Sequence, residues 1–401
     1  MSGAKDFTAE VAVVGGGPTG LVSAIALAAS GVETLMIAPA AGDDHRTTAL
    51  LAGSVTALAT LGVWPTCRRN AAPLSAIRIV DDSRRLLRAP EVRFAAAEIG
   101  LDAFGYNIEN RHLLAALSVR AAELKVPRVS ESALAVASDS EGVSIKLENG
   151  AARVRLAIGA DGQRSLCRAA AAIGTDRRAY PQTALTLNLS HDRPHQDTST
   201  EFHTESGPLT LVPLPGNRSS LVCVLEPTSA AALASMSDVE LADEIERCAH
   251  SLLGKMRIEA GRGVFPLAVE TAHCFARDRI ALVGEAAHVV PPIGAQGLNL
   301  GLRDAATLAE LVADARRQKC DVGSPRLLGR YDAQRRADVT SRRIAIDLLN
   351  RSLLTDFLPA QGVRGLALHL VERIRPLRRA LMREGVAPAA SRPRLMRGEM
   401  A

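Results

Sequence analysis

Aromatic side chains are scarce in this 401-residue sequence: phenylalanine, tyrosine and tryptophan together make up 3% of it, and Trp64 is the single tryptophan. Proteins that bind single-stranded nucleic acids stack bases on such side chains, so we expect no nucleic-acid partner. Apolar residues nevertheless make up 47% of the chain. The core must therefore be largely aliphatic, and the chain is long enough to form two core-containing units.

Cysteines are few and lie far apart. None of the six forms a C-x-x-C motif with another, and a chain of this size does not need disulfides to fold. We therefore expect reduced thiols and a cytoplasmic protein. The nine histidines are dispersed as well, without the ligand spacing of a zinc site, so we expect no bound metal.

Long apolar runs are also missing. Residues 11–29 form the most apolar stretch, but a glycine-rich turn interrupts them, and the N-terminus has no apolar segment of the kind found in signal peptides. We expect neither a membrane span nor a leader. The formal charge of +5 comes from scattered arginines, which are densest in residues 373–383. Such a run is typical of a solvated helix face, and also of a helix that binds anionic lipid or a partner.

The N-terminal part contains a strand–helix–strand pattern. Val11–Val14 has the composition of a buried strand, Leu21–Ala29 that of an apolar helix, and Thr34–Ile37 that of a second strand. This order is typical of a doubly wound α/β domain with a parallel sheet. The sequence therefore predicts that fold class for the start of the chain.

The turn between the first strand and the helix is "GGGPTG", which has the G-x-G-x-x-G spacing of dinucleotide-binding proteins. Gly15 permits a tight turn, Gly17 lets backbone N–H groups approach a pyrophosphate, and Gly20 lets the helix pack closely on the strand. The turn is a candidate nucleotide site.

One expected nucleotide ligand is absent. An acidic residue normally ends the second strand and holds a ribose hydroxyl, whereas Ala38 occupies that position here. The backbone, Asp43, Asp44 and Arg46 are the alternative ribose ligands, and the sequence does not choose among them.

The middle of the chain has a different pattern. Short alternating segments, among them "TSTEFHT" and "GPLTLVPL", are separated by Gly, Pro and Asn, as in antiparallel sheets. A helix should follow Ser237, because Ser237 and Glu240 have the spacing of a capping box. The predicted organisation is therefore a nucleotide-binding domain in residues 1–176, with some strands of the second domain near 74–100. An inserted antiparallel domain follows in 177–268, then the remainder of the first domain in 269–325 and a helical region in 326–401.

The helical region carries an apolar stripe within an arginine-rich segment. Its members are spaced for one face of a helix that Pro376 should kink or interrupt, and they are Leu366, Leu370, Ile374, Leu377 and Leu381.

Two further blocks carry chemistry. They are "GADGQRSLCR" in residues 159–168 and "GEAAHVVPPIGAQGLNLGLRDA" in residues 284–305. Together with the first glycine-rich turn, their order and separation resemble the class A flavoprotein aromatic hydroxylases. Residues 46–64, residues 207–214 and the tail "LMRGE" further resemble the ubiquinone-biosynthesis hydroxylases of the UbiH branch.

The resemblance implies a Rossmann-like FAD-binding domain of the GR2 type with an inserted antiparallel substrate domain. It implies an enzyme that takes electrons from NAD(P)H, forms a flavin C4a-hydroperoxide with O2, and hydroxylates a polyprenylated phenol in ubiquinone biosynthesis. Such an enzyme would be cytoplasmic, peripheral on the inner face of the cytoplasmic membrane, and in contact with other ubiquinone-biosynthesis proteins. The basic C-terminal region is the candidate membrane contact.

The resemblance also implies cofactor-binding positions. Glu285 stands where the family has an aspartate that contacts the ribityl or ribose oxygens, and a helix opening at Leu298 would stabilise the reduced flavin anion. Asn110 matches a polar residue near the cofactor, with Arg111 as the alternative, and Arg46 matches a phosphate ligand. Taken with the glycine turn, the candidate FAD-binding residues are Gly15, Gly17, Pro18, Thr19, Gly20, Arg46, Asn110, Arg111, Asp161, Gly284, Glu285, Pro292, Gly294, Gly297, Leu298 and Asn299.

Several roles stay open at this stage. Histidine as a residue type suits acid–base catalysis, which would favour a catalytic role for His288, but its motif position resembles a structural histidine, and we identify no catalytic residue. Ala295 stands where the family has glycine, so the resemblance fails locally if that position needs a positive φ. Alternative functions are a related flavin monooxygenase for another aromatic or isoprenoid substrate, and an FAD-binding assembly factor without catalysis.

Overall fold

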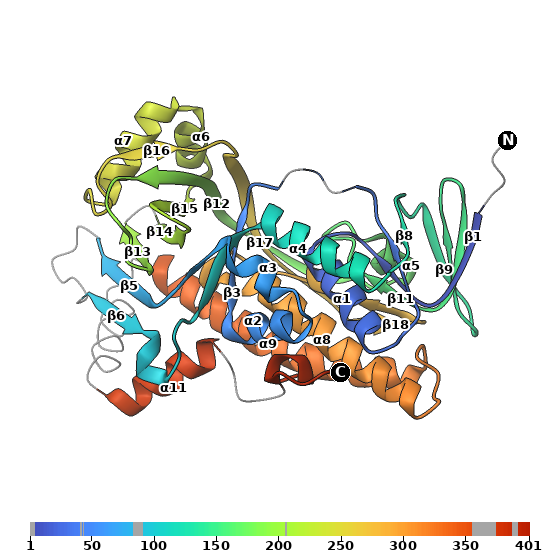
Figure 1. Ribbon diagram of the computed structural model, residues 1–401. Helices are drawn as coiled ribbons and strands as arrows, with labels where there is room; N and C mark the ends of the chain where they lie inside the picture. The colour runs from blue at the N-terminus through green and yellow to red at the C-terminus, as the bar shows by residue number, and fades with distance from the viewer. Residues whose placement is uncertain are drawn as a thin grey trace.

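The computed structural model describes residues 5–40, 42, 44–82, 91–204, 207–354, 374–386 and 392–401. Two large sheets lie toward opposite ends of an elongated molecule, and helices α8 (Gln296–Arg317) and α9 (Pro325–Leu354) run along one side of it (Figure 1). Asp43, Leu366 and Leu370, which the sequence had singled out, lie outside the described residues.

The first sheet has a parallel centre of five strands in the order β8-β2-β1-β11-β19. Their bounds are β1 (Lys5–Val14), β2 (Thr34–Ile37), β8 (Arg128–Val129), β11 (Gly150–Gly159) and β19 (Ile280–Leu282). In chain order this is 3-2-1-4-5, the arrangement of doubly wound nucleotide-binding sheets. The predicted α/β fold class is confirmed.

Antiparallel strands and helices complete this unit. The strands β9 (Ala135–Ser138), β10 (Val143–Lys146) and β18 (Ala276–Arg277) extend the sheet. Helix α8 packs on α1, which also contacts α4. The helices of the unit are α1 (Pro18–Ala29), α4 (Asn110–Glu123) and α5 (Leu166–Ala170).

The second sheet is antiparallel except where β13 pairs with β5 in parallel. Its order is β20-β17-β12-β15-β14-β13-β5-β6, with β16 beside β12. The bounds are β5 (Ala76–Asp81), β6 (Val92–Ala95), β12 (Thr175–His191), β13 (Thr198–Thr204), β14 (Gly207–Leu214), β15 (Arg218–Leu225), β16 (Met256–Ile258), β17 (Gly263–Ala272) and β20 (His288–Val289). Strands β12 and β17 run across the sequence-predicted domain limits at 176 and 268.

Two helices cover this sheet, α6 (Pro227–Ser235) and α7 (Asp238–Cys248). The capping box at the start of α7 is confirmed, because the Ser237 side chain accepts a hydrogen bond from the Glu240 N–H and the Glu240 carboxylate accepts one from the Ser237 N–H. The helix therefore begins where the sequence predicts.

A small third sheet is formed where the chain passes from one large sheet to the other and back. It consists of β3 (Thr47–Leu51), β7 (Gly105–Glu109) and β4 (Ala71–Pro73), in the order β3-β7-β4. Helices α2 (Ala52–Thr60) and α3 (Trp64–Arg68) follow β3, and the short helix η1 (Ala96–Ile99) follows β6.

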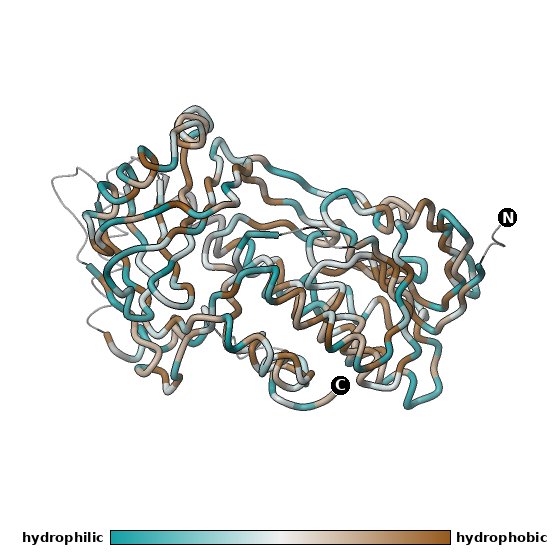
Figure 2. Tube along the Cα trace, turned by 45° about the horizontal axis from the view of Figure 1, so that its top comes forward, coloured by the Kyte–Doolittle hydropathy of each residue, from teal (hydrophilic) through white to brown (hydrophobic). Residues whose placement is uncertain are grey.

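Each large unit has its own aliphatic core. The core of the parallel unit includes Val13, Leu35 and Leu282, whereas Leu187 and Leu221 belong to the core between the antiparallel sheet and α7. Apolar segments gather inside both units in Figure 2. The expectation of two mainly aliphatic cores is met.

Pro376 was expected to kink or interrupt a helix, and a helix does begin beside it; the preceding members of the expected stripe, Leu366 and Leu370, lie outside the described residues. Helix α11 (Arg375–Val386) places Pro376 in its first turn, where proline costs no hydrogen bond and favours helix initiation. Ile374 precedes this helix. Among the described helices, none is both long and apolar enough to cross a membrane.

The end of the chain returns to the parallel unit. Residues Arg394–Arg397 form a short helix, η4, that contacts α2 and α8. Leu395 and Met396 are buried there, and the Arg394 guanidinium pairs with the Asp314 carboxylate at 2.9 Å. The tail thus packs along α8 and against α2.

Candidate functional site

Three parallel strands bring the three sequence blocks to one edge of the sheet. Val14 at the end of β1 pairs with Gly159 of β11, and Gly159 pairs with Leu282 of β19. The first block begins directly after Val14, the second begins at Gly159 itself, and the third begins two residues after Leu282. In doubly wound sheets ligands bind at the carboxyl ends of the strands, where the strand order reverses, and β1 and β11 are the strands on either side of that reversal.

The glycines of the first turn have three different environments. Gly15 has φ +121°, and a Cβ there would lie 2.2 Å from the Ala160 carbonyl oxygen. A Cβ at Gly20 would lie 2.1 Å from the Gly15 carbonyl oxygen. Around Gly17 no protein atom lies within 4 Å of such a Cβ. The turn is therefore closed on the protein side and open at Gly17.

Helix α1 begins at this opening with Pro18 as its first residue. Its N-cap, Gly17, has no side chain, so the N–H groups of the first turn have no side-chain acceptor. Thr19 touches the third block, since a Cβ at Gly301 would lie 2.6 Å from its hydroxyl oxygen and one at Gly284 3.0 Å from it. Two glycines thus allow α8 and the third block to approach α1.

Asp161 and Arg168 organise the second block. The Asp161 carboxylate accepts hydrogen bonds from the Ser165 hydroxyl at 2.6 Å and the Cys167 N–H at 3.0 Å. The Arg168 guanidinium donates to the Ala286 carbonyl at 3.0 Å. These contacts hold the second and third blocks together.

Glu285 lies exposed on the short helix η2 (Gly284–Ala286). Its carboxylate accepts a hydrogen bond from the Gln163 amide at 3.4 Å. The Asp44 carboxylate, and after it the charge of Glu285, raise the pKa of Arg46 against the effect of burial. The Arg46 guanidinium and the Glu285 carboxylate, far apart in the sequence, therefore interact electrostatically in the fold.

Arg46 and Asn110 belong to one hydrogen-bonded group. The Arg46 guanidinium donates to both oxygens of Asp44, at 2.8 and 2.7 Å. The Asn110 amide donates to Asp44 at 2.9 Å, and its carbonyl accepts from the Thr48 hydroxyl. Arg111 instead pairs with the buried Glu109 at 3.0 Å. The structure brings Asn110, rather than Arg111, together with Arg46.

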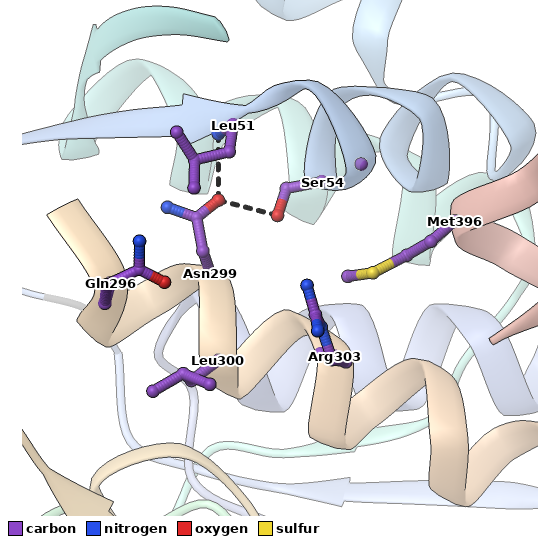
Figure 3. Close-up of a pocket in the computed structure, with 8 residues that line it drawn as sticks. Leu51, Ser54, Gln296, Asn299, Leu300, Arg303 and Met396 are labelled. Atoms are coloured by element: carbon purple, nitrogen blue, oxygen red, sulfur yellow. Dashed lines mark hydrogen bonds between the residues drawn. The ribbon is translucent and has the colours of Figure 1, made fainter. Parts of the chain in front are cut away.

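Asn299 uses its whole side-chain amide within the protein. Its oxygen accepts from the Leu51 N–H at 2.9 Å and the Ser54 hydroxyl at 2.7 Å, and its nitrogen donates to the carbonyls of Ala49 and Ala295. Figure 3 shows this side chain pointing from α8 toward Leu51 and Ser54. The pocket drawn there holds about 10 Å³, room for one water molecule at most. Asn299 therefore fixes the start of α8 against β3 and α2.

The loop before α8 contains two successive left-handed residues. Gly294 has φ 64°, and Ala295 has φ 53° and ψ 34°. The position that is glycine in the resembling family thus does take a positive φ, and the alanine costs about 1–2 kcal/mol there. The helix begins at Gln296, two residues before the predicted Leu298, with Gly297 and Leu298 in its first turn and no side-chain cap. Pro292 lies exposed at the start of η3 (Ile293–Ala295).

His288 is buried against the carboxylate of Asp304. Its side chain is 1% exposed, and Nε2 lies 2.6 Å from the Asp304 carboxylate. Burial opposes a charge on Asp304, but His288 and Arg335 hold its pKa below the usual value. These contacts agree with a structural histidine.

The place of the missing acidic residue is occupied differently. Ala38 is 1% exposed, and its methyl group would lie 2.9 Å from a Cβ at Gly16. The guanidinium of Arg128, from β8, donates to the carbonyls of Ala38 and Pro39 at 3.4 and 2.6 Å. Asp44 pairs with Arg46. A guanidinium group therefore stands beside the glycine turn where other nucleotide-binding sheets have a carboxylate.

These features fit a dinucleotide such as FAD. Two helices, α1 and α8, direct N–H groups without side-chain caps toward the same edge of the sheet, and such helix ends bind anionic groups. Gly17 leaves room for a phosphate to approach the backbone. Among the described residues, no group of three or more His, Cys, Asp and Glu is placed to hold a metal.

Comparison with known proteins decides the family. A family described as "FAD binding domain" matches residues 8–342. The chain belongs to this family. Because the match covers both sheets and the three blocks, it applies to the whole architecture and not to the glycine turn alone.

Similar sequences extend over nearly the full chain. Ubiquinone hydroxylase UbiL of Rhodospirillum rubrum is 36% identical over 99% of this chain and 95% of its own length. The 3-demethoxyubiquinol 3-hydroxylase of Escherichia coli is 32% identical over 93% of this chain and 97% of its own. The mitochondrial ubiquinone biosynthesis monooxygenase of the mouse is 28% identical over 84% and 80%.

Solved structures share the fold. The p-nitrophenol 4-monooxygenase of Pseudomonas putida superposes with a TM-score of 0.79 at 19% identity, over 96% of this chain and 100% of the other. A variant of HpxO from Klebsiella pneumoniae, complexed with FAD, superposes with a TM-score of 0.76 at 19% identity, over 95% and 99%. This protein is an FAD-dependent monooxygenase of that fold.

Sequence reasoning missed two parts of the site. Arg128 reaches the glycine turn only because β8 pairs with β2, and no local pattern announces that pairing. Helix α9 directs four polar side chains toward β19 and α8: the Tyr331 hydroxyl bonds to the Leu282 carbonyl of β19, and Arg335, Asp338 and Arg342 bond to side chains of α8. Their spacing of four, three and four residues marks one helix face, which is the signal that was available.

Proposed function

We propose that this monooxygenase hydroxylates the aromatic ring of a polyprenylated phenol in ubiquinone biosynthesis, with NAD(P)H as electron donor and O2 as oxygen source. The observation that carries the proposal is the similarity to ubiquinone hydroxylases across almost the whole chain, including the substrate-side sheet. FAD, when bound, supplies the activation of oxygen. The ring position is left to the experiment below.

The proposed FAD site is the edge formed by β1, β11 and β19. The N–H groups at the start of α1 would bind the pyrophosphate, and the start of α8 would face the flavin. Glu285, Arg46 and Asn110 would supply polar contacts, while Asp161 and Asn299 would position backbone through the bonds they already make. The residues assigned to this site are Gly15, Gly17, Pro18, Thr19, Gly20, Arg46, Asn110, Asp161, Gly284, Glu285, Pro292, Gly294, Gly297, Leu298 and Asn299.

The chain's own contribution is orientation and exclusion of water. The loop from Gly284 to Gln296 carries one exposed charge, Glu285, and one buried histidine, so its remaining surface is uncharged. An uncharged loop next to the reacting ring limits the entry of water, which would otherwise divert the reaction to hydrogen peroxide.

Deletion of the gene in its host tests the identity of the substrate. We expect a host without this protein to accumulate a ubiquinone precursor lacking one ring hydroxyl, and mass spectrometry of the quinone extract identifies the missing position. Expression of the protein should restore ubiquinone, whereas Gly17→Ala should not. An unchanged quinone profile, with a purified protein that is yellow and oxidises NAD(P)H in the presence of another phenol, would assign a different aromatic substrate.

The C-terminal surface is the proposed membrane contact, on the inner face of the cytoplasmic membrane. Helix α11 packs against the rest of the protein through the buried Met382 and through Arg378, whose guanidinium pairs with Glu98 of η1 at 2.7 Å. Ile374 and Leu381 are 43% and 51% exposed beside exposed arginines. Apolar side chains with arginine neighbours suit an anionic lipid surface.

Vesicle flotation tests this contact. The FAD-loaded protein should float with phosphatidylglycerol vesicles, and the double variant Ile374→Asp, Leu381→Asp should stay in the soluble fraction with its flavin intact. Val239→Asp is the matched control, because Val239 is 72% exposed on α7, in the other unit. Equal flotation of both variants would refute the assignment of this surface.

A further inference from the structure

Helix α9 is joined to the third block through a buried ionic contact. The Arg335 guanidinium, 1% exposed, donates from Nε to Asp304 at 2.6 Å and from Nη1 to Asp338 at 2.6 Å. The other oxygen of Asp304 accepts from the Gly284 N–H at 2.9 Å. One side chain of α9 is therefore a single carboxylate away from the first residue of the loop.

A second connection reaches the other end of the same loop. The Arg342 guanidinium donates to the Gln296 side-chain carbonyl at 3.0 Å and to Asp338 at 3.1 Å. The Gln296 amide in turn donates to the carbonyl of Gly294 at 3.1 Å. Gly294 is the first of the two left-handed residues, which need such external support to persist. Arg342 thus holds the loop through the residues on either side of Ala295, the non-glycine residue that takes the left-handed conformation.

The cluster has more positive than negative groups. Three guanidiniums, those of Arg303, Arg335 and Arg342, face the carboxylates of Asp304 and Asp338, all with side chains between 0% and 11% exposed. Burial, together with the charges of Arg342 and Arg335, lowers the pKa of Arg303 to about 10 despite the opposing effect of Asp338. Within the described part of the chain, Arg303 Nε and Arg335 Nη2 are buried without a hydrogen-bond acceptor. Donors and positive charge are in excess.

We propose that Arg342 is a positioning residue for the flavin: through Gln296 it holds the left-handed loop before α8, and its charge, which the two carboxylates leave uncompensated, favours the reduced flavin over the oxidised flavin. This inference rests on the proposed placement of the flavin beside that loop. Reduction adds negative charge to the flavin, and a fixed positive charge in a poorly solvated place stabilises it.

The reduction potential of the bound flavin tests the proposal. In Arg342→Gln two guanidiniums still face two carboxylates, so the variant should fold. We expect its ratio of reduced to oxidised flavin, at the same applied potential, to be at least threefold lower than in the wild type. Arg342→Lys keeps the charge and should stay closer to the wild type. The control is Arg336→Gln on the same helix, because Arg336 is 49% exposed and pairs with Asp332 at the surface. The potential is measured by dye-coupled titration of the FAD-loaded protein.

The outcomes distinguish a failure of the proposed function from a failure of this inference alone. A wild-type protein that cannot be loaded with FAD refutes the proposed function and this inference with it. A yellow protein whose potential is the same in wild type, Arg342→Gln and Arg336→Gln refutes the inference alone. An equal fall in Arg342→Lys and Arg342→Gln also refutes it, because the effect would then follow side-chain shape and not charge.

Discussion

Gly17 and Gly20 lie in the same turn but should respond differently to an added methyl group. Gly17 has φ −71° and ψ 175°, which alanine adopts freely, and its surroundings are open. A Cβ at Gly20 meets the Gly15 carbonyl at 2.1 Å. We expect Gly17→Ala to fold with a stability within about 0.5 kcal/mol of the wild-type apoprotein and to lose FAD, and Gly20→Ala to fold poorly.

Urea unfolding of the apoprotein and fluorescence titration with FAD measure the two effects separately. The pair is informative because only a ligand can make Gly17 indispensable. Tight FAD binding by Gly17→Ala would move the pyrophosphate away from this turn.

Arg128 yields a second prediction at this scale. Its guanidinium lies beside the glycine turn and is bonded to the carbonyls of Ala38 and Pro39, so it can attract the phosphates of a dinucleotide. We expect Arg128→Ala to weaken FAD binding about tenfold, measured by titration of the apoprotein. Arg153→Ala serves as control. Arg153 lies in β11 away from the carboxyl end of that strand, and it pairs with Asp139. Equal dissociation constants in both variants would exclude a role of Arg128.

The single residues that were predictable from sequence are those with a local cause. The glycines of the first turn act within six residues, and their three roles follow from spacing alone. The positive φ of Ala295 was a conditional expectation, since the family pattern marks the position but not the backbone angle. Arg128 was not predictable, because its place depends on a strand pairing between distant segments.

At the scale of elements, the short helix η4 should matter more than its position at the chain end implies. Met396 is 5% exposed between α2 and α8, whereas Met400 is 45% exposed four residues later. We expect Met396→Ala to lower the free energy of unfolding by about 2–5 kcal/mol, and Met400→Ala to change it by less than about 0.5 kcal/mol. Urea denaturation measures both. Similar stabilities of the two variants would mean that the tail does not stay on the parallel unit in solution.

Alternating and capped elements were predicted well from sequence. Strand β13 and strand β14 have the bounds of the alternating segments, and α7 begins at its capping box. Helix α9 shows where this fails. Arg335 in a run of arginines looks like a solvent-facing residue, and only the carboxylates of Asp304 from α8 and of Asp338 from α9 itself make its burial tolerable.

For the whole molecule, the buried cluster predicts sensitivity to acid. Burial disfavours charge on Asp304 and Asp338, but the neighbouring cations lower the pKa of both below the usual value. Each carboxylate therefore binds protons more readily in the unfolded chain, whose aspartates titrate near pH 3.9. Its contribution to stability is complete above about pH 5 and is lost as the pH falls through the lower folded-state pKa.

Urea unfolding between pH 7 and pH 3.5 measures this linkage. We expect the wild-type free energy of unfolding to decrease steeply below about pH 5. Asp338→Asn should be less stable at pH 7, because the amide removes one acceptor oxygen and the negative charge that buried guanidiniums share, and should depend less on pH in the acid range. A variant with the same acid slope as the wild type would remove Asp338 from the linkage.

The order of strands in the parallel sheet also determines how long one edge of β1 stays unpaired while the chain is being synthesised. Strand β1 emerges early together with β2, but its other neighbour, β11, reaches it through the pairing of Val14 with Gly159. Translation at about 5–20 residues per second leaves that edge uncovered for roughly 7–29 s. A nascent chain that exposes an apolar strand for that long is a natural client for chaperones. The yield of folded protein in a foreign host should therefore rise when a ribosome-associated chaperone is co-expressed.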